Sequence, residues 1–166
     1  MEIIPMLLKE MEQEAQTTRK MLERVPEDKF LWQPHPKSMT MQRLASHVAE
    51  LPGWVHMALT TDALNLMQSE FKPVLANNRT ELLEMHEKAY IQGREQLEKA
   101  DEELLKKNWQ MRGGANGEEL WYEAPKGDVI RMSFSQTVHH RAQLGVFLRL
   151  LDIPIPGSYG PSADEH

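Results

Sequence analysis

Apolar residues recur at steps of three and four positions through four long stretches of this sequence. That spacing places them on one face of an α-helix, so each stretch predicts an amphipathic helix. The helices are expected over about 4–24, from Ser38 or Thr40 to 59, from just after 78–81 to 107, and over 132–152. Because each has one apolar face to bury, the sequence predicts an all-α four-helix bundle.

Short polar residues mark the starts of two of these helices. Thr40 is a good N-cap for the second helix, while Asn78 and Glu81 have capping-box spacing at the start of the third. Pro52-Gly53 falls inside the second helix, and proline lacks the backbone N–H that the helix needs there. We therefore expect a kink at that point. The third helix is mostly charged, as expected for an outer helix.

The segment 108–130 lacks helical periodicity. Its glycine-rich part, 112–117, is expected to form an irregular loop. Residues 120–122 and 128–130 then flank the turn Pro125-Lys126-Gly127, which predicts a small β-hairpin before the last helix.

The length suits a single domain over 1–166, since a chain of this size can bury one sizeable core. A long connection joins the second and third helices. Pro154 and Pro156 end the last helix, and 154–166 is expected to be an extended C-terminal tail.

Composition narrows the function classes. The formal net charge is -6 and no Lys/Arg cluster stands out, so no nucleic-acid partner is expected. No apolar run is long enough to span a bilayer, which predicts no membrane partner and a cytoplasmic location. Because there is no cysteine, any metal must be held by imidazole, carboxylate or amide oxygen.

The last helix places polar residues on its inward face. At about 100° per residue, Gln136 and His140 share one stripe with apolar residues. Those apolar residues are Leu144, Phe147 and Leu151. His139 falls on the shoulder of the stripe, whereas Arg141 and Arg149 are predicted to face solvent. Of the adjacent histidines, His140 is therefore expected to be the buried one.

The second helix offers a partner for this residue, because His47 lies on the flank of its apolar stripe. His47, His140 and Gln136 can therefore converge between two helices, where bundles build metal sites. Two interpretations stay open from the residues alone. The histidines can ligate a metal, or they can hydrogen-bond to each other, to Gln136 or to a buried water.

Two parts of the chain resemble the DinB/YfiT-like family. The segments 34–40 and 44–50 are similar to that family's entry into its second helix. The segments 139–144 and 159–165 are similar to its final helix and tail. The resemblance covers nearly the whole chain. It implies an up–down–down–up bundle, a homodimer, and a divalent metal held by three histidines.

Carried onto this sequence, the resemblance assigns His47 as the first ligand and His140 as the third. The second ligand position holds Gln136 instead of histidine. The metal, zinc or nickel, could be held weakly with Gln136 as ligand, His139 could replace Gln136, or the site could be metal-free. An amide oxygen is a weaker ligand than imidazole for these metals.

The resemblance implies a metal-dependent enzyme, a hydrolase or a thiol-cofactor transferase, acting on a small-molecule substrate; it assigns no catalytic side chain. The alternative is a non-catalytic, metal-free bundle that binds a small ligand or acts as a dimeric interaction protein. Di-iron carboxylate chemistry is rejected. It needs a glutamate followed three residues later by a histidine, whereas here His47 comes before Glu50, and His140 has no inward acid nearby. His86, among charged neighbours, is expected to be solvated.

Overall fold

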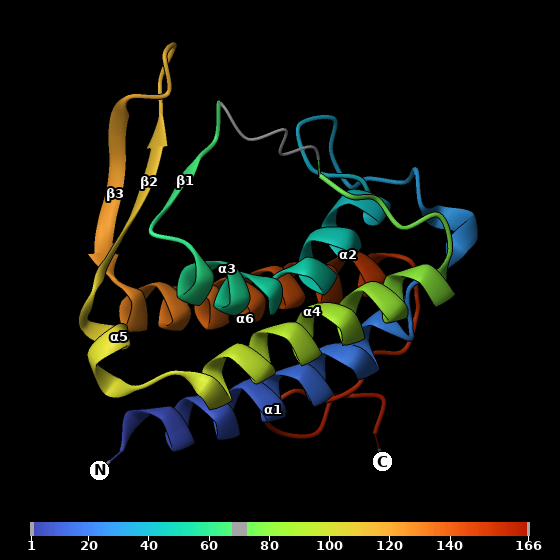
Figure 1. The fold of residues 1–166 in the computed structure, drawn as a ribbon. Helices are drawn as coiled ribbons and strands as arrows, with labels where there is room; N and C mark the ends of the chain where they lie inside the picture. Colours follow the sequence, from blue (N-terminus) through green and yellow to red (C-terminus); the bar gives the residue numbers. More distant parts are fainter. Residues whose placement is uncertain (1, 68–72, 166) are drawn as a thin grey trace.

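The computed structural model describes residues 2–67 and 73–165, and these are mostly helical (Figure 1). The long helices are α1 (Ile3–Leu22), α4 (Arg79–Lys99) and α6 (Lys126–Leu150). The shorter elements are a 3-10 turn (Glu27–Lys29), α2 (Met41–Glu50), α3 (Gly53–Thr60) and α5 (Glu102–Lys106). The strands are β1 (Ala63–Asn65), β2 (Asn108–Gly113) and β3 (Glu119–Pro125). None of the described helices combines the length and apolar character needed to cross a membrane.

The predicted second helix is divided in two. Helix α2 ends at Glu50 and α3 begins at Gly53, so the expected kink is a break. Pro52 has no N–H to donate to the preceding turn. The chain instead forms hydrogen bonds between residues three apart, from the Trp54 N–H to the Leu51 carbonyl and from the Val55 N–H to the Pro52 carbonyl. Together α2 and α3 take the place expected of one helix, and they pack against α4 and α6.

The predicted caps are confirmed. Thr40 Oγ1 accepts a bond from the Arg43 N–H at 3.2 Å, which starts α2. Asn78 Oδ1 accepts from the Glu81 N–H at 2.8 Å, and the Glu81 carboxylate in return accepts from the Asn77 N–H at 2.8 Å. These bonds satisfy N–H groups that a helix start leaves without intrahelical partners. The third helix ends earlier than predicted, at Lys99, and α5 follows as a separate turn.

A three-stranded sheet, in the order β1-β2-β3, stands at one end of the helices (Figure 1). Strand β1 runs parallel to β2, and β2 is antiparallel to β3. The all-α prediction is therefore corrected to a mostly helical fold with a small sheet. Strand β1 was missed because a three-residue strand is too short to show an alternating pattern.

The hairpin exists, but the predicted register was wrong. Its turn lies between Gly113 and Glu119, where Gly114 and Gly117 adopt positive φ angles of 78° and 68°. Glycine reaches that region without the steric cost that other residues carry. The predicted turn, 125–127, instead spans the last residue of β3 and the start of α6, and α6 includes the whole of 128–130.

Helix α6 begins six residues before the predicted start because its first residue is anchored in the core. Lys126 is 2% exposed, and its ammonium group donates to the Thr61 carbonyl and lies 3.0 Å from Asp62 Oδ1. The buried Trp109 of β2 donates to Thr61 Oγ1 at 3.0 Å. These contacts fix the sheet to the start of α6 and the end of α3.

The apolar core forms two clusters. One lies where α1 ends and α6 ends, and includes Leu22 and Leu148. The other lies toward the sheet and includes Met11 and Phe134. Along the helices, the positions between the clusters hold the buried polar residues Thr18 of α1, His86 of α4, and Thr137 and Arg141 of α6. The bundle therefore has a polar layer across its middle.

Arg141 was predicted to face solvent, and this was wrong: it is 1% exposed. Its guanidinium donates to Glu14 Oε2 at 2.6 Å, Thr18 Oγ1 at 3.0 Å and the Tyr159 hydroxyl at 2.7 Å. The true inward stripe of α6 runs through Thr137, Arg141, Leu144 and Leu148. A buried guanidinium is tolerated here because both of its terminal nitrogens donate to oxygen acceptors.

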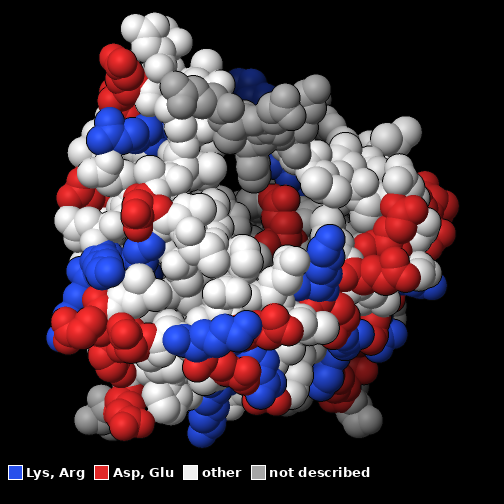
Figure 2. Space-filling model, in the orientation of Figure 1, with Lys and Arg blue, Asp and Glu red and all other residues white. Residues whose placement is uncertain are grey.

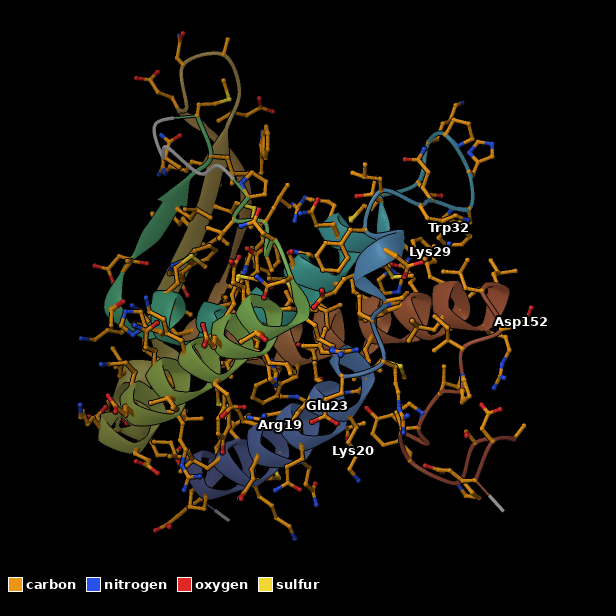
Figure 3. All side chains as sticks on the ribbon, turned by 90° about the vertical axis from the view of Figure 1, so that its right-hand side faces the viewer. Arg19, Lys20, Glu23, Lys29, Trp32 and Asp152 are labelled. Carbon is orange, nitrogen blue, oxygen red and sulfur yellow. The ribbon has the colours of Figure 1, made fainter. Side chains whose placement is uncertain are left out.

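The C-terminal segment and the link between α1 and α2 lie at the end of the molecule opposite the sheet (Figure 1). Figure 3 views that end, with Arg19, Lys20 and Glu23 along the last part of α1 and Asp152 just beyond α6. The segment that carries Trp32 leads from there into α2. Residues 154–165 form no regular helix or strand, and turn back so that Glu165 accepts from the Gly157 and Ser162 N–H groups. Figure 2 shows acidic and basic side chains interspersed over the face that α1 and α4 cover.

A substitution at Gly93 tests how closely α4 approaches the break between α2 and α3. A Cβ there would lie 2.6 Å from both the Pro52 carbonyl oxygen and Met11 Cε. We expect Gly93→Ala to lower the free energy of unfolding by about 1–3 kcal/mol, because the clash with backbone exceeds the gain in helix propensity. Chemical denaturation measures this.

Gly53→Ala is the matched control for that substitution. A Cβ at Gly53 would meet Ala89 Cβ at 3.6 Å, an ordinary van der Waals contact. Its free energy of unfolding should change by less than about 1 kcal/mol. Equal effects of the two substitutions would contradict the close approach of α4 to Pro52.

Candidate functional site

The structure brings together two of the three residues predicted for the site. The ring centroids of His47 on α2 and His140 on α6 are 4.7 Å apart, with the rings at 73° to one another. Their helices pack side by side, so neither residue departs from regular helical backbone to make this approach. The pair joins positions that lie far apart in the sequence.

Each imidazole is oriented by the residue three positions after it. His47 Nδ1 lies 2.7 Å from Glu50 Oε1, and His140 Nδ1 lies 2.8 Å from Gln143 Oε1. Both partner oxygens are acceptors, so each Nδ1 carries the proton and donates. The neutral form of each ring therefore keeps a lone pair on Nε2. From the sequence, Glu50 was weighed only as a di-iron ligand and Gln143 was not singled out, although the i, i+3 spacing is a signal that could have found both contacts.

The other predicted residues lie at the edge of this pair. Gln136 is exposed on α6, one turn before His140, and His139 is exposed with its ring centroid 4.8 Å from that of His140. His140 itself is half-buried at the border of the inward face, and not in its centre as predicted. Within residues 2–67 and 73–165, no three histidine or acidic side chains are grouped to hold a metal ion.

The surroundings of His140 favour its neutral form. Partial burial lowers the pKa of His140 below its ordinary value of 6.5, and the nearby His47, His139 and Arg43 lower it further. The bond to Gln143 acts in the opposite direction. A neutral imidazole can accept a proton or ligate a metal, whereas a protonated one can do neither.

Arg43 adds a positive charge to the site, one turn before His47 on α2. Its Nη1 atom pairs with Glu50 Oε1 at 3.9 Å, beyond hydrogen-bond distance, and is buried without a hydrogen-bond partner in the described part of the chain. Glu50 thus lies between a histidine that it orients and an arginine that it partly neutralises.

A cavity of about 350 Å³ opens beside His140. The segment before α2 contributes Lys37 and Ser38, and α6 contributes His140 and Gln143. Figure 2 shows that the face above α2 and α3 is also hollowed. His140 therefore borders a space that a small molecule could enter, as expected for a ligand site.

His86, which was predicted to be solvated, is fully buried. Its Nε2 lies 3.1 Å from the Ala15 carbonyl and donates to it, so the ring links α4 to α1. The charged neighbours Glu84 and Lys88 in the sequence obscured this. Its position in the stripe with Leu82, Ala89 and Leu97 is the signal that could have revealed its burial.

Comparisons with known proteins agree with one another. A family model described as DinB family matches residues 4–166. A DinB-like protein from Bacillus subtilis has a similar structure, with a TM-score of 0.71 and 14% identity over 92% of this chain and 97% of that one. A DinB-like protein from Bacillus cereus has a TM-score of 0.69 and 16% identity over 92% and 95%. No curated protein sequence matches.

Removing the Gln143 side-chain oxygen that accepts from His140 should change the pKa of His140. Because the bond to Gln143 favours the protonated ring, Gln143→Leu is expected to lower the pKa of His140 further. Nitrogen-detected NMR titration of the histidine rings measures the change. Gln13→Leu on the exposed face of α1 should leave the pKa of His140 where it is. An unchanged or raised pKa in Gln143→Leu would contradict the geometry described.

His86 should make stability depend on pH. Burial lowers its folded-state pKa below 6.5, so as the pH falls the unfolded chain takes up this proton first. The stability that neutral His86 contributes is therefore complete above pH 6.5 and is lost as the pH falls toward the folded-state pKa. We expect the free energy of unfolding to fall less between pH 7 and pH 5.5 in His86→Gln than in the wild type. Equal slopes would refute this role.

Proposed function

This chain belongs to the DinB family, and we propose that it is a metal-dependent enzyme, a hydrolase or thiol-cofactor transferase, acting on a small molecule at the His47–His140 pair. The observation that carries the proposal is the geometry of that pair. The Nδ1 atom of each ring is hydrogen-bonded, which leaves each Nε2 as the nitrogen with a lone pair. The ring centroids are 4.7 Å apart.

The residues present fit a divalent metal such as zinc or nickel. His47 and His140 would supply two imidazole nitrogens, and Gln136 would supply an amide oxygen from the preceding turn of α6. A carboxylate behind a ligating histidine is a common support, because it fixes the tautomer and raises the basicity of the ligating nitrogen. The Glu50 contact to His47 has that form.

Bound there, the metal would lower the pKa of a water or thiol ligand and so supply a nucleophile near neutral pH. The protein residues have simpler tasks. Glu50 and Gln143 hold the proton on each Nδ1, which keeps the rings from rotating. The cavity beside His140 would bind the substrate and reduce its contact with water.

A second candidate function follows from Gln136. In the described residues, no three histidine or acidic side chains form a metal group, and Gln136 is exposed. These observations favour a metal-free bundle in which the histidine pair contacts a small ligand directly, or a dimeric interaction protein. Metal affinity separates the two functions.

The metal test uses chelator-treated protein titrated with Zn²⁺ or Ni²⁺ by calorimetry. The enzyme proposal expects binding of about one metal per chain, lost in His47→Ala and His140→Ala. Glu50→Gln should weaken the affinity by about 10–100-fold, as loss of a supporting contact does. His56→Ala on α3 is the matched control and should bind like the wild type.

Gln136→His decides between the two functions. If it creates tight metal binding where the wild type shows none, the natural protein is metal-free and the second candidate stands. If the wild type binds one metal and Gln136→His changes its affinity little, the enzyme proposal stands. An absence of metal binding in both proteins would overturn the metal site altogether.

A further inference from the structure

The cavity beside His140 has an uneven distribution of charge. Its walls include the apolar side chains of Leu44 on α2 and Phe147 on α6. Lys37 and Ser38 lie on the side formed by the segment before α2. None of the described residues that line it is aspartate or glutamate. A ligand in this cavity would therefore meet an apolar surface and a cation, with no carboxylate to repel an anion.

Lys37 is available to such a ligand. Its side chain is exposed, and in the described part of the chain it takes part in no ion pair. The Lys37 N–H donates to His35 Nδ1 at 3.1 Å, so the backbone that carries the lysine is held in a turn. Lys37 is the one lysine, arginine or acidic residue among the described residues that line the cavity, so the charge there favours an anion.

The Phe147 part of the apolar wall is packed against Trp32. The Trp32 ring packs edge-on against Phe147, with centroids 5.6 Å apart and an interplanar angle of 84°. Phe147 belongs to the core cluster that also holds Leu44. A flat apolar group could pack on this wall without rearranging it.

We propose that this cavity binds a small organic anion, with its anionic group near Lys37, its apolar body against Leu44 and Phe147, and its other end toward His140. This substrate class rests on the proposed function of the same site, but its binding requires no metal. It adds to that function the statement that the substrate is a carboxylate or similar anion with an apolar body.

Phenylacetate and phenethylamine are suitable probes, because they share an apolar body and differ in the sign of their charge. Each is titrated into chelator-treated protein while Trp emission is followed, and Trp32→Phe identifies the part of the signal that comes from Trp32. We expect phenylacetate to change the Trp32 emission saturably and phenethylamine to leave it unchanged at the same concentrations.

Lys37 variants then test the charge. Lys37→Gln should weaken phenylacetate binding by about two- to fivefold, the range of an exposed ion pair. Lys37→Glu should weaken it more, because it places a like charge there. Lys9→Gln, an exposed lysine on α1, is the matched control and should bind like the wild type. Since Lys37 is exposed, these changes are compatible with folding.

Three results would overturn the inference: equal binding of the two probes, no saturable signal with phenylacetate, or phenylacetate binding that Lys37→Glu leaves unchanged. The outcome is separate from that of the metal titration. Anion binding without metal binding would overturn the enzyme proposal alone, and metal binding without anion binding would overturn the substrate class alone.

Discussion

The rotation of α6 about its own axis is set by the buried guanidinium of Arg141. Taking that charge out of water is costly, and the cost is offset only because Glu14, Thr18 and Tyr159 supply acceptors around it. Any other rotation would leave the guanidinium or the Glu14 carboxylate without its partner. With Arg141 directed at α1, the preceding residue, His140, lies about 100° around the helix, toward α2. The ion pair that holds α6 against α1 therefore also directs His140 to His47.

The same rotation explains why the site lies at the border of the core. His140 and His47 are half-buried, and His140 lines the cavity. His86 gives the contrast: fully buried between α4 and α1, it donates to a backbone carbonyl and has a structural task. Partial burial lowers the pKa of His140 and so favours its neutral form, and the cavity leaves this residue open to a ligand.

Local rules predicted much of the fold. The caps at Thr40 and Asn78 were readable because an N-cap depends on residues within one turn of chain. The DinB resemblance was also readable, and the match over residues 4–166 confirms it. The hairpin was misplaced because a turn at 125–127 and one between Gly113 and Glu119 are both locally plausible. The buried Lys126 decides between them, and its partners are some 65 residues away.

The sequence by itself determined the helical periodicity, the capped helix starts and the placement of His47 and His140 on helices, because each depends on spacing within a few turns. It did not determine which face of α6 is buried. The apolar residues Leu144 and Phe147 allow either the stripe through His140 or the one through Arg141. Only the packing of α1 and the tail against α6 supplies Glu14 and Tyr159, without which a buried arginine would be unstable. That tertiary contact placed His140 beside His47 and left Gln136 exposed.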